Sequence, residues 1–337
     1  MFLSIVIPVY NAEKEICHCL ESIWSQGISE EDFEVICVDD YSTDNSCAVI
    51  EREIVRHSNL RLIRNEVNRR AGGARNHGVQ EAKGEYVLFI DADDYFHSGS
   101  LHKAVEHLKA NPDLDLLVCN FARELPDQPN DIFVHKYATE EKLSIKEYIQ
   151  KSHIPCAPWQ WLFQRTLMTN NNIWFRENCI SEDVDWTHRL VLVAKYIQYQ
   201  PILLTHYTIG IGTQTAMSYA KPANVYSYMR AGNELYKLCN AYDTMGCGTY
   251  LRNLSRGYFS QGLKYYLAMR DSISNKVTSI RTIIPKTISL AFPWNIARRL
   301  PYLYSFVTNL LCPFAVFVLK NKVKHNFRGI RRKANND

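Results

Sequence analysis

The stretch EYVLFIDADD, residues 85–94, joins an apolar run of strand-forming residues to three aspartates. Carboxylates this close repel one another and lose hydration at the edge of a core, so packing alone does not explain them. They become favourable if a divalent cation and a phosphate-bearing ligand lie at the carboxyl end of the strand, where open parallel sheets bind ligands. A solvated acidic turn is the alternative interpretation of this stretch alone.

An alternation of strands and helices leads up to these aspartates. Apolar, β-branched runs predict strands over residues 4–9, 33–38, 60–63, 85–90 and 114–119. Helical spacing of apolar residues predicts helices from Ile16 to a stop at Gly27, from 45 to 56 and from 72 to 82. This order favours an α/β fold with a parallel, doubly wound sheet. A second predicted strand also ends in paired acids, Asp39 and Asp40.

Four motifs, in this order along residues 5–94, resemble the inverting family 2 glycosyltransferases of the GT-A fold. The motifs are IVIPVYN at 5–11, VDDYSTD at 38–44, ARNHG at 74–78 and GEYVLFIDADD at 84–94. The resemblance implies a GT-A fold, with a doubly wound, mostly parallel sheet flanked by helices and a helical C-terminal extension. Two positions depart from the family, which usually has glycine where Tyr41 stands and often has glycine where Arg70 stands.

The resemblance assigns the nucleotide-sugar contacts to residues at the first two strand ends and in the ARNHG motif. Asp40 would accept the imide N–H of a uracil, although a guanine also offers an N–H donor. Pro8 and Tyr10 would line the same pocket, and Asp39 would support its loop. Arg75 would pair with the diphosphate or the base edge, because guanidinium forms paired hydrogen bonds with oxyanions. An ordinary arginine on a helix surface is the alternative for Arg75.

The D-x-D element of the resemblance implies a metal site. Asp91 and Asp93 would share a face in an ideal strand. We expect Asp93 to be the principal metal ligand and Asp91 to contact the ribose or the metal. Oxygen ligation favours Mn2+ or Mg2+, with water and phosphate oxygens completing the shell. Asp94 is a candidate acceptor contact.

The segment SEDVDW, residues 181–186, resembles the E-D element of the family. Asp183 would be the general base that takes the proton of the acceptor hydroxyl, and Glu182 would position the acceptor or support the base. Direct displacement with a single carboxylate base implies inversion at the anomeric carbon. Acids favoured by the dipole at a helix N-terminus are the alternative. His206 lies in a stretch that resembles a loop closing over the nucleotide, and it stays outside the predicted site.

These assignments divide the chain into three regions. We expect residues 1–120 to form the nucleotide-sugar-binding half of a GT-A domain, 121–220 the acceptor-binding half, and 221–337 a helical region. The predicted activity is metal-dependent, inverting transfer of a sugar from a nucleoside diphosphate sugar, with UDP favoured, to a hydroxyl of a glycan or lipid-linked oligosaccharide. A catalytically inactive sugar-nucleotide-binding module is the alternative function.

Two other enzyme classes fit poorly. A Rossmann dehydrogenase needs a G-x-G-x-x-G turn after the first strand, where this chain has PVYN at 8–11. A sugar nucleotidyltransferase would need a basic, glycine-rich loop at the same place.

The C-terminal part has the composition of a membrane-associating segment. Residues 300–319 are uncharged, and 320–337 carry seven Lys or Arg and one Asp, although the whole chain has a net charge of only +4. An interfacial segment within 281–337, a membrane span and a docked helix remain open. Ten scattered cysteines and no signal-peptide pattern predict a cytoplasmic protein, at the inner face of the membrane. The basic tail lacks a nucleic-acid-reading motif, so no nucleic-acid partner is expected.

Overall fold

The computed structural model describes residues 1–125, 128–131, 139–152, 154–179, 181–208, 222–242, 247–268 and 271–283, together with Leu303 and Ser305. The chain divides into two compact units, Met1–Ile211 and Gly212–Asp337. The first unit contains every residue of the predicted site.

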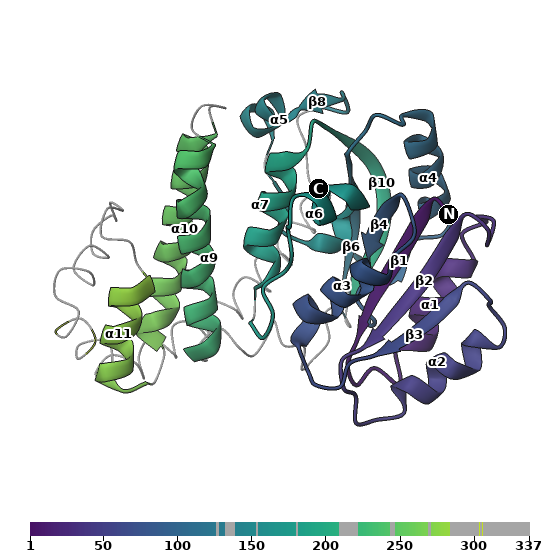
Figure 1. Cartoon of the computed structure of the whole chain (residues 1–337), viewed down its shortest axis with the longest axis horizontal. Coiled ribbons are helices and arrows are strands. Elements are labelled where there is room, and N and C mark those ends of the chain that lie inside the picture. Colours follow the sequence, from purple (N-terminus) through teal and green to yellow (C-terminus); the bar gives the residue numbers. More distant parts are fainter. Residues whose placement is uncertain are drawn as a thin grey trace. The chain divides into compact units, whose positions relative to one another are not determined.

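The first unit alternates strands and helices through its first half, as the sequence predicts (Figure 1). Its first elements are β1 (Leu3–Val9), α1 (Ile16–Trp24), β2 (Phe33–Asp39), α2 (Ser46–Ile54), β3 (Leu60–Arg64), α3 (Arg70–Glu81), β4 (Tyr86–Phe89), β5 (Tyr95–Phe96), α4 (Ser100–Ala110) and β6 (Leu116–Leu125). Those that follow are β7 (Gln128–Asp131), β8 (Leu143–Ser144), α5 (Ile145–Lys151), a 3-10 turn (Pro158–Gln160), β9 (Trp161–Gln164), α6 (Arg165–Asn170), α7 (Asp183–Val193) and β10 (Tyr196–Thr208).

The strands form one sheet in the order β3-β2-β1-β4-β9-β6-β10-β5, with β7 beside β6 and β8 beside β10. The four strands at the β3 end are parallel, which is the predicted doubly wound half. The other half is mixed, because β9 runs antiparallel to both β4 and β6. The two halves therefore share one continuous sheet.

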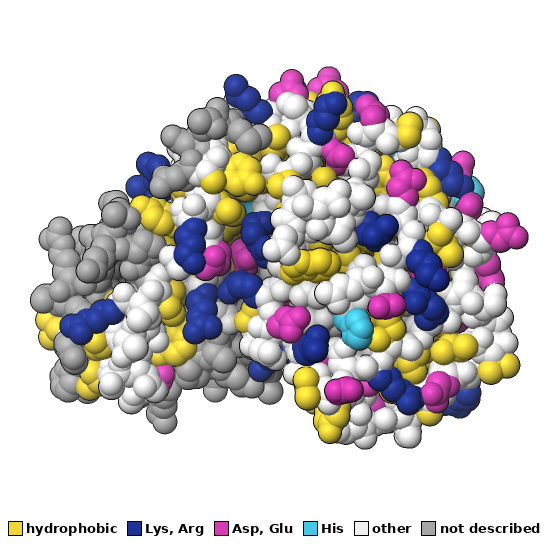
Figure 2. All heavy atoms as spheres, viewed as in Figure 1, with side chains coloured by type: hydrophobic (Ala, Val, Ile, Leu, Met, Phe, Trp, Pro, Cys, Tyr) yellow, Lys and Arg dark blue, Asp and Glu magenta, His cyan; other side chains and the backbone are white. Residues whose placement is uncertain are grey.

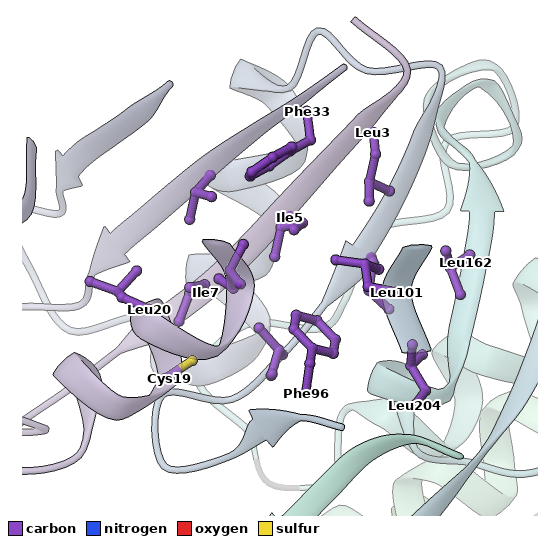
Figure 3. Packing of buried hydrophobic residues seen from close by; sticks show 14 of the residues in the cluster. Leu3, Ile5, Ile7, Cys19, Leu20, Phe33, Phe96, Leu101, Leu162 and Leu204 are labelled. Atoms are coloured by element: carbon purple, nitrogen blue, oxygen red, sulfur yellow. The ribbon is translucent and has the colours of Figure 1, made fainter. Parts of the chain in front are cut away.

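The two faces of β1 pack against different helices because side chains alternate along a strand. Ile5 and Ile7 belong to the core cluster that includes Leu20 of α1 and Leu101 of α4 (Figure 3). On the opposite face, α3 lies against β1 and β2. A Cβ on Gly78 of α3 would lie 2.3 Å from Val6 of β1, so glycine permits this close approach. Both faces are covered, which explains why β1 and β2 are continuous apolar runs.

The visible face of the first unit carries acidic and basic side chains interspersed, without a large area of one sign (Figure 2). Such a surface does not by itself indicate a polyanionic or polycationic partner.

The second unit is helical in its described part, as expected for residues 222–280. It contains α9 (Pro222–Ala241), α10 (Gly248–Ala268) and α11 (Ile273–Ile283). Its core includes Val225, Met229, Phe259, Leu263, Tyr266 and Ile280. Helical spacing of the apolar residues in α9 predicts Tyr226, Met229, Leu235, Tyr236 and Leu238 as core positions; Met229 and Leu235 are fully buried, and the other three are half-buried.

Within the described residues, no helix combines the length and apolar character needed to cross a bilayer. The membrane prediction for residues 281–337, including the apolar stretch 300–319 and the basic tail, falls almost entirely outside the described residues.

Candidate active site

The carboxylate of Asp40 is held at the end of β2 by donors from a later segment of the chain. Asp40 is 3% exposed. Its Oδ1 accepts hydrogen bonds from Asn65 Nδ2 at 2.9 Å and from the backbone N–H of Arg69 at 2.8 Å. Asn68 Nδ2 donates to the carbonyl of Asp40. No described residue donates to Oδ2, so one carboxylate oxygen is fixed and the other is available to a ligand N–H.

The turns that follow β1 and β2 are tied to each other. The backbone N–H of Asn11 donates to Ser42 Oγ at 2.9 Å, and Asn11 Oδ1 accepts the backbone N–H of Thr43 at 2.8 Å. Asp39 Oδ2 accepts the backbone N–H of Ser42, which is the supporting geometry expected of this acid. These bonds fix the shape of the corner around Asp40.

Pro8 and Tyr10 lie at the end of β1 beside this corner. The register pairs Val9 with Asp39, so Tyr10 and Asp40 are the next residues of adjacent strands. Pro8 is half-buried, whereas Tyr10 is 49% exposed. The structure therefore brings these two predicted pocket residues to the same strand ends as Asp40.

The two positions that depart from the family pattern both have left-handed backbone. Tyr41 has φ 70° and Arg70 has φ 62°. Non-glycine residues adopt this region at a conformational cost, which explains why glycine suits both positions. The departures leave the turn geometry in place but add strain next to Asp40.

The three aspartates after β4 lie in a turn rather than on an extended strand. β4 ends at Phe89, and the N–H of Asp94 donates to the carbonyl of Asp91 at 3.0 Å. The expectation that Asp91 and Asp93 share a strand face is therefore wrong, because the strand alternation stops before them. Asp91 is partly exposed and Asp93 is exposed. The turn keeps both carboxylates at the sheet edge.

Asp93 and Asp94 differ in their surroundings. Although the Asp93 residue is exposed, the crowded turn partly desolvates its carboxyl, and this loss of hydration together with the nearby charge of Asp91 raises the pKa of Asp93 to about 6. Asp94 is 1% exposed, and burial raises its pKa well above the usual range. Its Oδ1 accepts the N–H of Thr208 at 2.9 Å, so it joins the aspartate turn to the end of β10.

Arg75 of α3 connects two predicted site residues that are far apart in sequence. Its Nη2 lies 2.6 Å from Asp91 Oδ1, and its Nη1 lies 2.9 Å from Glu182 Oε1. The Arg75 side chain is only 5% exposed, and its guanidinium carbon lies 5.9 Å and 5.5 Å from the ring centres of Phe89 and Phe175. This environment excludes the ordinary surface-arginine interpretation.

A glycine allows this connection. Gly72 lies in the first turn of α3, where a Cβ would meet the carbonyl oxygen of Arg176 at 2.8 Å and Glu182 Cγ at 3.0 Å. Because glycine lacks that atom, the start of α3 can lie directly against the segment before α7. Arg75 is then one turn away from Gly72 and within reach of Glu182.

Asp183 begins α7, with Glu182 at its N-cap. Burial, with the neighbouring charge of Glu182, raises the pKa of Asp183 to about 7, while Arg75 and backbone N–H groups oppose the shift. A carboxylate with a pKa near neutrality can take a proton from a hydroxyl and release it again, which suits a general base.

An aromatic cluster fixes α7 to the sheet beneath these acids. Trp186 of α7 stacks on Phe175 at 4.1 Å and contacts Phe89 of β4 and Phe163 of β9 edge-on. Contacts of this type prefer defined ring geometries, so they orient the helix as well as bury it. The start of α7 is thereby held near the end of β4.

Helix α3 thus organises the predicted site. At its N-terminal end the N–H of Arg69 binds Asp40, and further along Arg75 binds Asp91 and Glu182. The structure consequently brings the Asp40 corner, the aspartate turn and the start of α7 around one helix.

The carboxylates of Asp91 and Asp93 fit a divalent ion that binds together with a phosphate-bearing substrate. Within the described residues, no group of three or more His, Cys, Asp or Glu side chains is arranged to hold a metal. Mg2+ and Mn2+ in phosphate-transfer sites need only one or two carboxylates, the rest of the shell being water and phosphate oxygens. The exposed carboxylate of Asp93 and the oxygen of Asp91 that is not bound to Arg75 lie in the same turn and would supply such carboxylates.

His206 lies in a separate hydrogen-bonded group on β10. Its Nδ1 is 3.0 Å from Glu124 Oε1 and its Nε2 is 3.0 Å from His97 Nδ1. Its ring stacks on Tyr95, and the phenol of Tyr95 donates to Glu124. Burial lowers the pKa of His206. His206, His97 and Tyr95 border an open hollow of about 350 Å³, and the hydrogen-bond partners of His206 are His97 and Glu124 rather than Asp91 or Asp93.

Several supporting residues were not predicted from the sequence. Asn65 and Arg69 hold Asp40, and Asn11 joins the two turns. Asn65 directly follows β3 and lies two residues beyond the predicted strand 60–63, so a polar residue near a third strand end was the available signal. The contact of Arg69 uses only its backbone N–H, which no side-chain pattern reveals.

The mixed α/β sheet with acids at its strand ends is compatible with a glycosyltransferase, and comparison with known proteins agrees. Residues 4–168 match the model of the family described as "Glycosyl transferase family 2". The chain belongs to this glycosyltransferase family.

Curated relatives include two poly(ribitol-phosphate) glycosyltransferases. The chain is 33% identical over 232 residues to the poly(ribitol-phosphate) beta-glucosyltransferase of Bacillus spizizenii, covering 68% of this chain and 36% of that protein. It is 30% identical over 233 residues to the poly(ribitol-phosphate) beta-N-acetylglucosaminyltransferase TarS of Staphylococcus aureus, covering 68% and 39%. The chain therefore spans well under half the length of these two relatives.

Solved structures identify the fold as GT-A. S. aureus TarS 1–349 in complex with UDP-GlcNAc superposes with a TM-score of 0.65 at 20% identity, covering 96% of this chain and 92% of that one. The mannosyltransferase PcManGT from Pyrobaculum calidifontis, in complex with GDP-Man and Mn2+, has a TM-score of 0.51 at 16% identity, covering 91% and 86%. At these identities the similarity establishes the fold alone.

Proposed function

We propose that this chain transfers a sugar from a nucleoside diphosphate sugar to a hydroxyl of a glycan or lipid-linked oligosaccharide, with inversion at the anomeric carbon and UDP as the favoured nucleotide. The observation that carries the proposal is the ion-paired group Asp91–Arg75–Glu182, next to an Asp183 whose pKa is about 7. It brings a proton acceptor and a D-x-D turn to one place in the fold.

Each residue has a role that follows from its environment. Asp40, with one oxygen fixed and the other available, accepts the ring N–H of the base, and Pro8 and Tyr10 line that pocket. Asp39 holds the turn through the N–H of Ser42. Asp91 contacts the ribose or the metal in this proposal, through the oxygen that Arg75 does not hold.

The reaction itself needs a proton acceptor on the side opposite the leaving diphosphate. Asp183 takes the proton of the acceptor hydroxyl. At the same time the hydroxyl oxygen bonds to the anomeric carbon, and the bond between that carbon and the diphosphate oxygen breaks. Such assistance is typically worth about 10²- to 10⁴-fold in rate. Glu182 positions Asp183, and Arg75 holds Glu182 in place.

Asp93 is the proposed principal ligand of Mn2+ or Mg2+, with Asp91 as the second carboxylate. A divalent ion bound there would neutralise the charge that grows on the departing diphosphate. The Mn2+ named in the PcManGT complex supports this choice of cofactor.

The proposed acceptor and location follow from the names of the relatives and the composition of the C-terminal part. Poly(ribitol-phosphate) in the names of two relatives supports a surface-polymer acceptor, with synthesis at the cytoplasmic face of the membrane. The apolar and basic composition of residues 300–337 supports peripheral contact with anionic lipid. The division of the first unit into a nucleotide-sugar half and an acceptor half is part of the same proposal.

A nucleotide screen tests the proposal. Thermal shifts of the full chain are measured with UDP, GDP, ADP and their sugar derivatives, with and without Mn2+, because a ligand of the native state raises its apparent stability. We expect UDP compounds to raise the Tm only when Mn2+ is present. Indifference to every nucleotide would overturn the proposal. Tight binding without turnover on any hydroxyl acceptor would favour the inactive binding module.

A further inference from the structure

Tyr41 is a large side chain in an unfavourable place. It has φ 70° and is 57% exposed. Aromatic residues rarely adopt left-handed backbone, and such strain persists only where the surroundings impose it. The surroundings here are the bonds of Ser42 and Thr43 to Asn11, which fix the turn on its far side.

The fold gains no visible contact from the tyrosine side chain. Within the described residues, the Tyr41 ring stacks on no other ring and its hydroxyl makes no recorded hydrogen bond. The same is true of Tyr10, which is 49% exposed. Most large exposed apolar side chains of this unit lie singly, but these two lie on the adjacent ends of β1 and β2. Packing therefore gives no account of why Tyr41 occupies a strained position.

Asp40, which is a neighbour of both Tyr10 and Tyr41, supplies a reason. Asp40 is directly opposite Tyr10 in the continued register of β1 and β2, and it precedes Tyr41 in the chain. Its Oδ1 is occupied by Asn65 and Arg69, and its Oδ2 has no protein donor. A flat heterocycle with a ring N–H can bond to this oxygen, and both tyrosines are neighbours of Asp40, Tyr10 across the two strand ends and Tyr41 along the chain.

We infer that Tyr41 is a further determinant of donor binding, which stacks on the heterocyclic base held by Asp40 and complements Tyr10. This inference rests on the proposed function. Base stacking on an aromatic ring tolerates different bases, so the hydrogen bond of Asp40 selects the N–H edge and Tyr41 adds affinity. The affinity that the ring adds is then the reason why this chain keeps a large side chain in the left-handed turn.

Substitutions at Tyr41 separate a stacking role from a structural one. Tyr41→Gly relieves the strained backbone, so the Tm is expected to rise by about 2 °C. The same change removes the ring, so UDP with Mn2+ should bind about 10-fold more weakly by calorimetry. Tyr41→Phe should bind like the wild type, and Tyr41→Leu, which keeps the strain and the bulk, should bind like Tyr41→Gly.

Asn172→Gly is the matched control, because Asn172 also has a positive φ, 54°, but bonds to Trp174 away from the strand ends. It should leave UDP affinity unchanged. Equal UDP affinity in wild type, Tyr41→Gly and Tyr41→Leu would overturn the inference while leaving the proposed function intact. Failure of the wild type to bind any nucleotide would instead remove the proposed function and this inference with it.

Discussion

Two parts of the α3 region hold carboxylates in different ways: the neutral end, at Arg69 just before the helix, and the charged end, at Arg75 within it. Near Arg69, Asp40 is fixed by neutral hydrogen-bond donors, an asparagine amide and a backbone N–H. One turn into the helix, Arg75 holds Asp91 and Glu182 by charge. The difference matches the tasks proposed for each end. A carboxylate that reads a base needs a fixed direction, whereas a proton acceptor needs a tuned pKa, and charges tune a pKa more strongly than neutral groups.

The largest expected effect is at the charged end. Asp183→Asn removes the proton acceptor but keeps the shape, so kcat should fall by about 10²- to 10⁴-fold. In the wild type, Asp183 must lose its proton to act, so the rate should rise with pH and level off above about 7, the pKa of Asp183. Initial rates of sugar transfer between pH 5 and 9 measure both effects. Full activity in Asp183→Asn would show that another group takes the proton.

Arg75→Gln tests whether the charged end depends on the guanidinium. It leaves Asp91 and Glu182 without their shared partner in a mostly buried place, so the free energy of unfolding should fall by about 3–5 kcal/mol. Arg75 also opposes the rise in the pKa of Asp183, so the pH profile of residual activity should move to higher pH.

Arg56→Gln is the control for this change, since Arg56 pairs with Glu53 at 3.2 Å but is 71% exposed. Exposed pairs contribute about 1 kcal/mol or less. Urea unfolding of both variants provides the comparison. If Arg75→Gln cost no more than Arg56→Gln, the Arg75 bridge would be unimportant for the fold.

Asp40→Asn tests the neutral end. The amide oxygen can still accept from Asn65 and Arg69, so the fold should be preserved. The second oxygen becomes an NH2 group that cannot accept the N–H of a base. Loss of a hydrogen bond to a charged group costs about 1.5–3 kcal/mol, or roughly 10- to 150-fold in UDP affinity by calorimetry. Unchanged affinity would place the base elsewhere.

The smallest effect should come from the contact between Gly72 of α3 and the segment before α7. Gly72→Ala places a methyl 2.8 Å from the carbonyl oxygen of Arg176, so we expect a loss of about 1–2 kcal/mol in unfolding free energy. Gly257→Ala on α10 is the opposite case, because its Cβ would meet nothing within 4 Å, and it should gain about 0.5–1 kcal/mol from helix propensity. A stable Gly72→Ala with normal kinetics would show that the segment before α7 can move aside.

The fold of the first half could be predicted from the sequence because its parallel strands are buried on both faces. Such strands are continuous apolar runs, as in residues 4–9 and 33–38, and helices separate them. The strand β9 gave a weaker signal, since it has only four residues and pairs antiparallel with strands from much earlier in the chain.

The acids of the site could also be predicted, because each stands at the end of an apolar run or at a helix start. Their mutual contacts could not. Arg75 and Glu182 are 107 residues apart, and no local pattern states that they meet. The only sequence signal for the left-handed backbone at Tyr41 was that the family usually has glycine at that position.

The insertion of β9 between β4 and β6 has a consequence for how the chain can be divided. A polypeptide ending near residue 120 would contain β4 without its neighbour on one side. The bare edge of β4 would present unpaired N–H and C=O groups to other molecules, and such edges promote association. We therefore expect residues 1–120 to aggregate when expressed alone, and to stay monodisperse only when the segment that supplies Trp161–Gln164 is expressed with them.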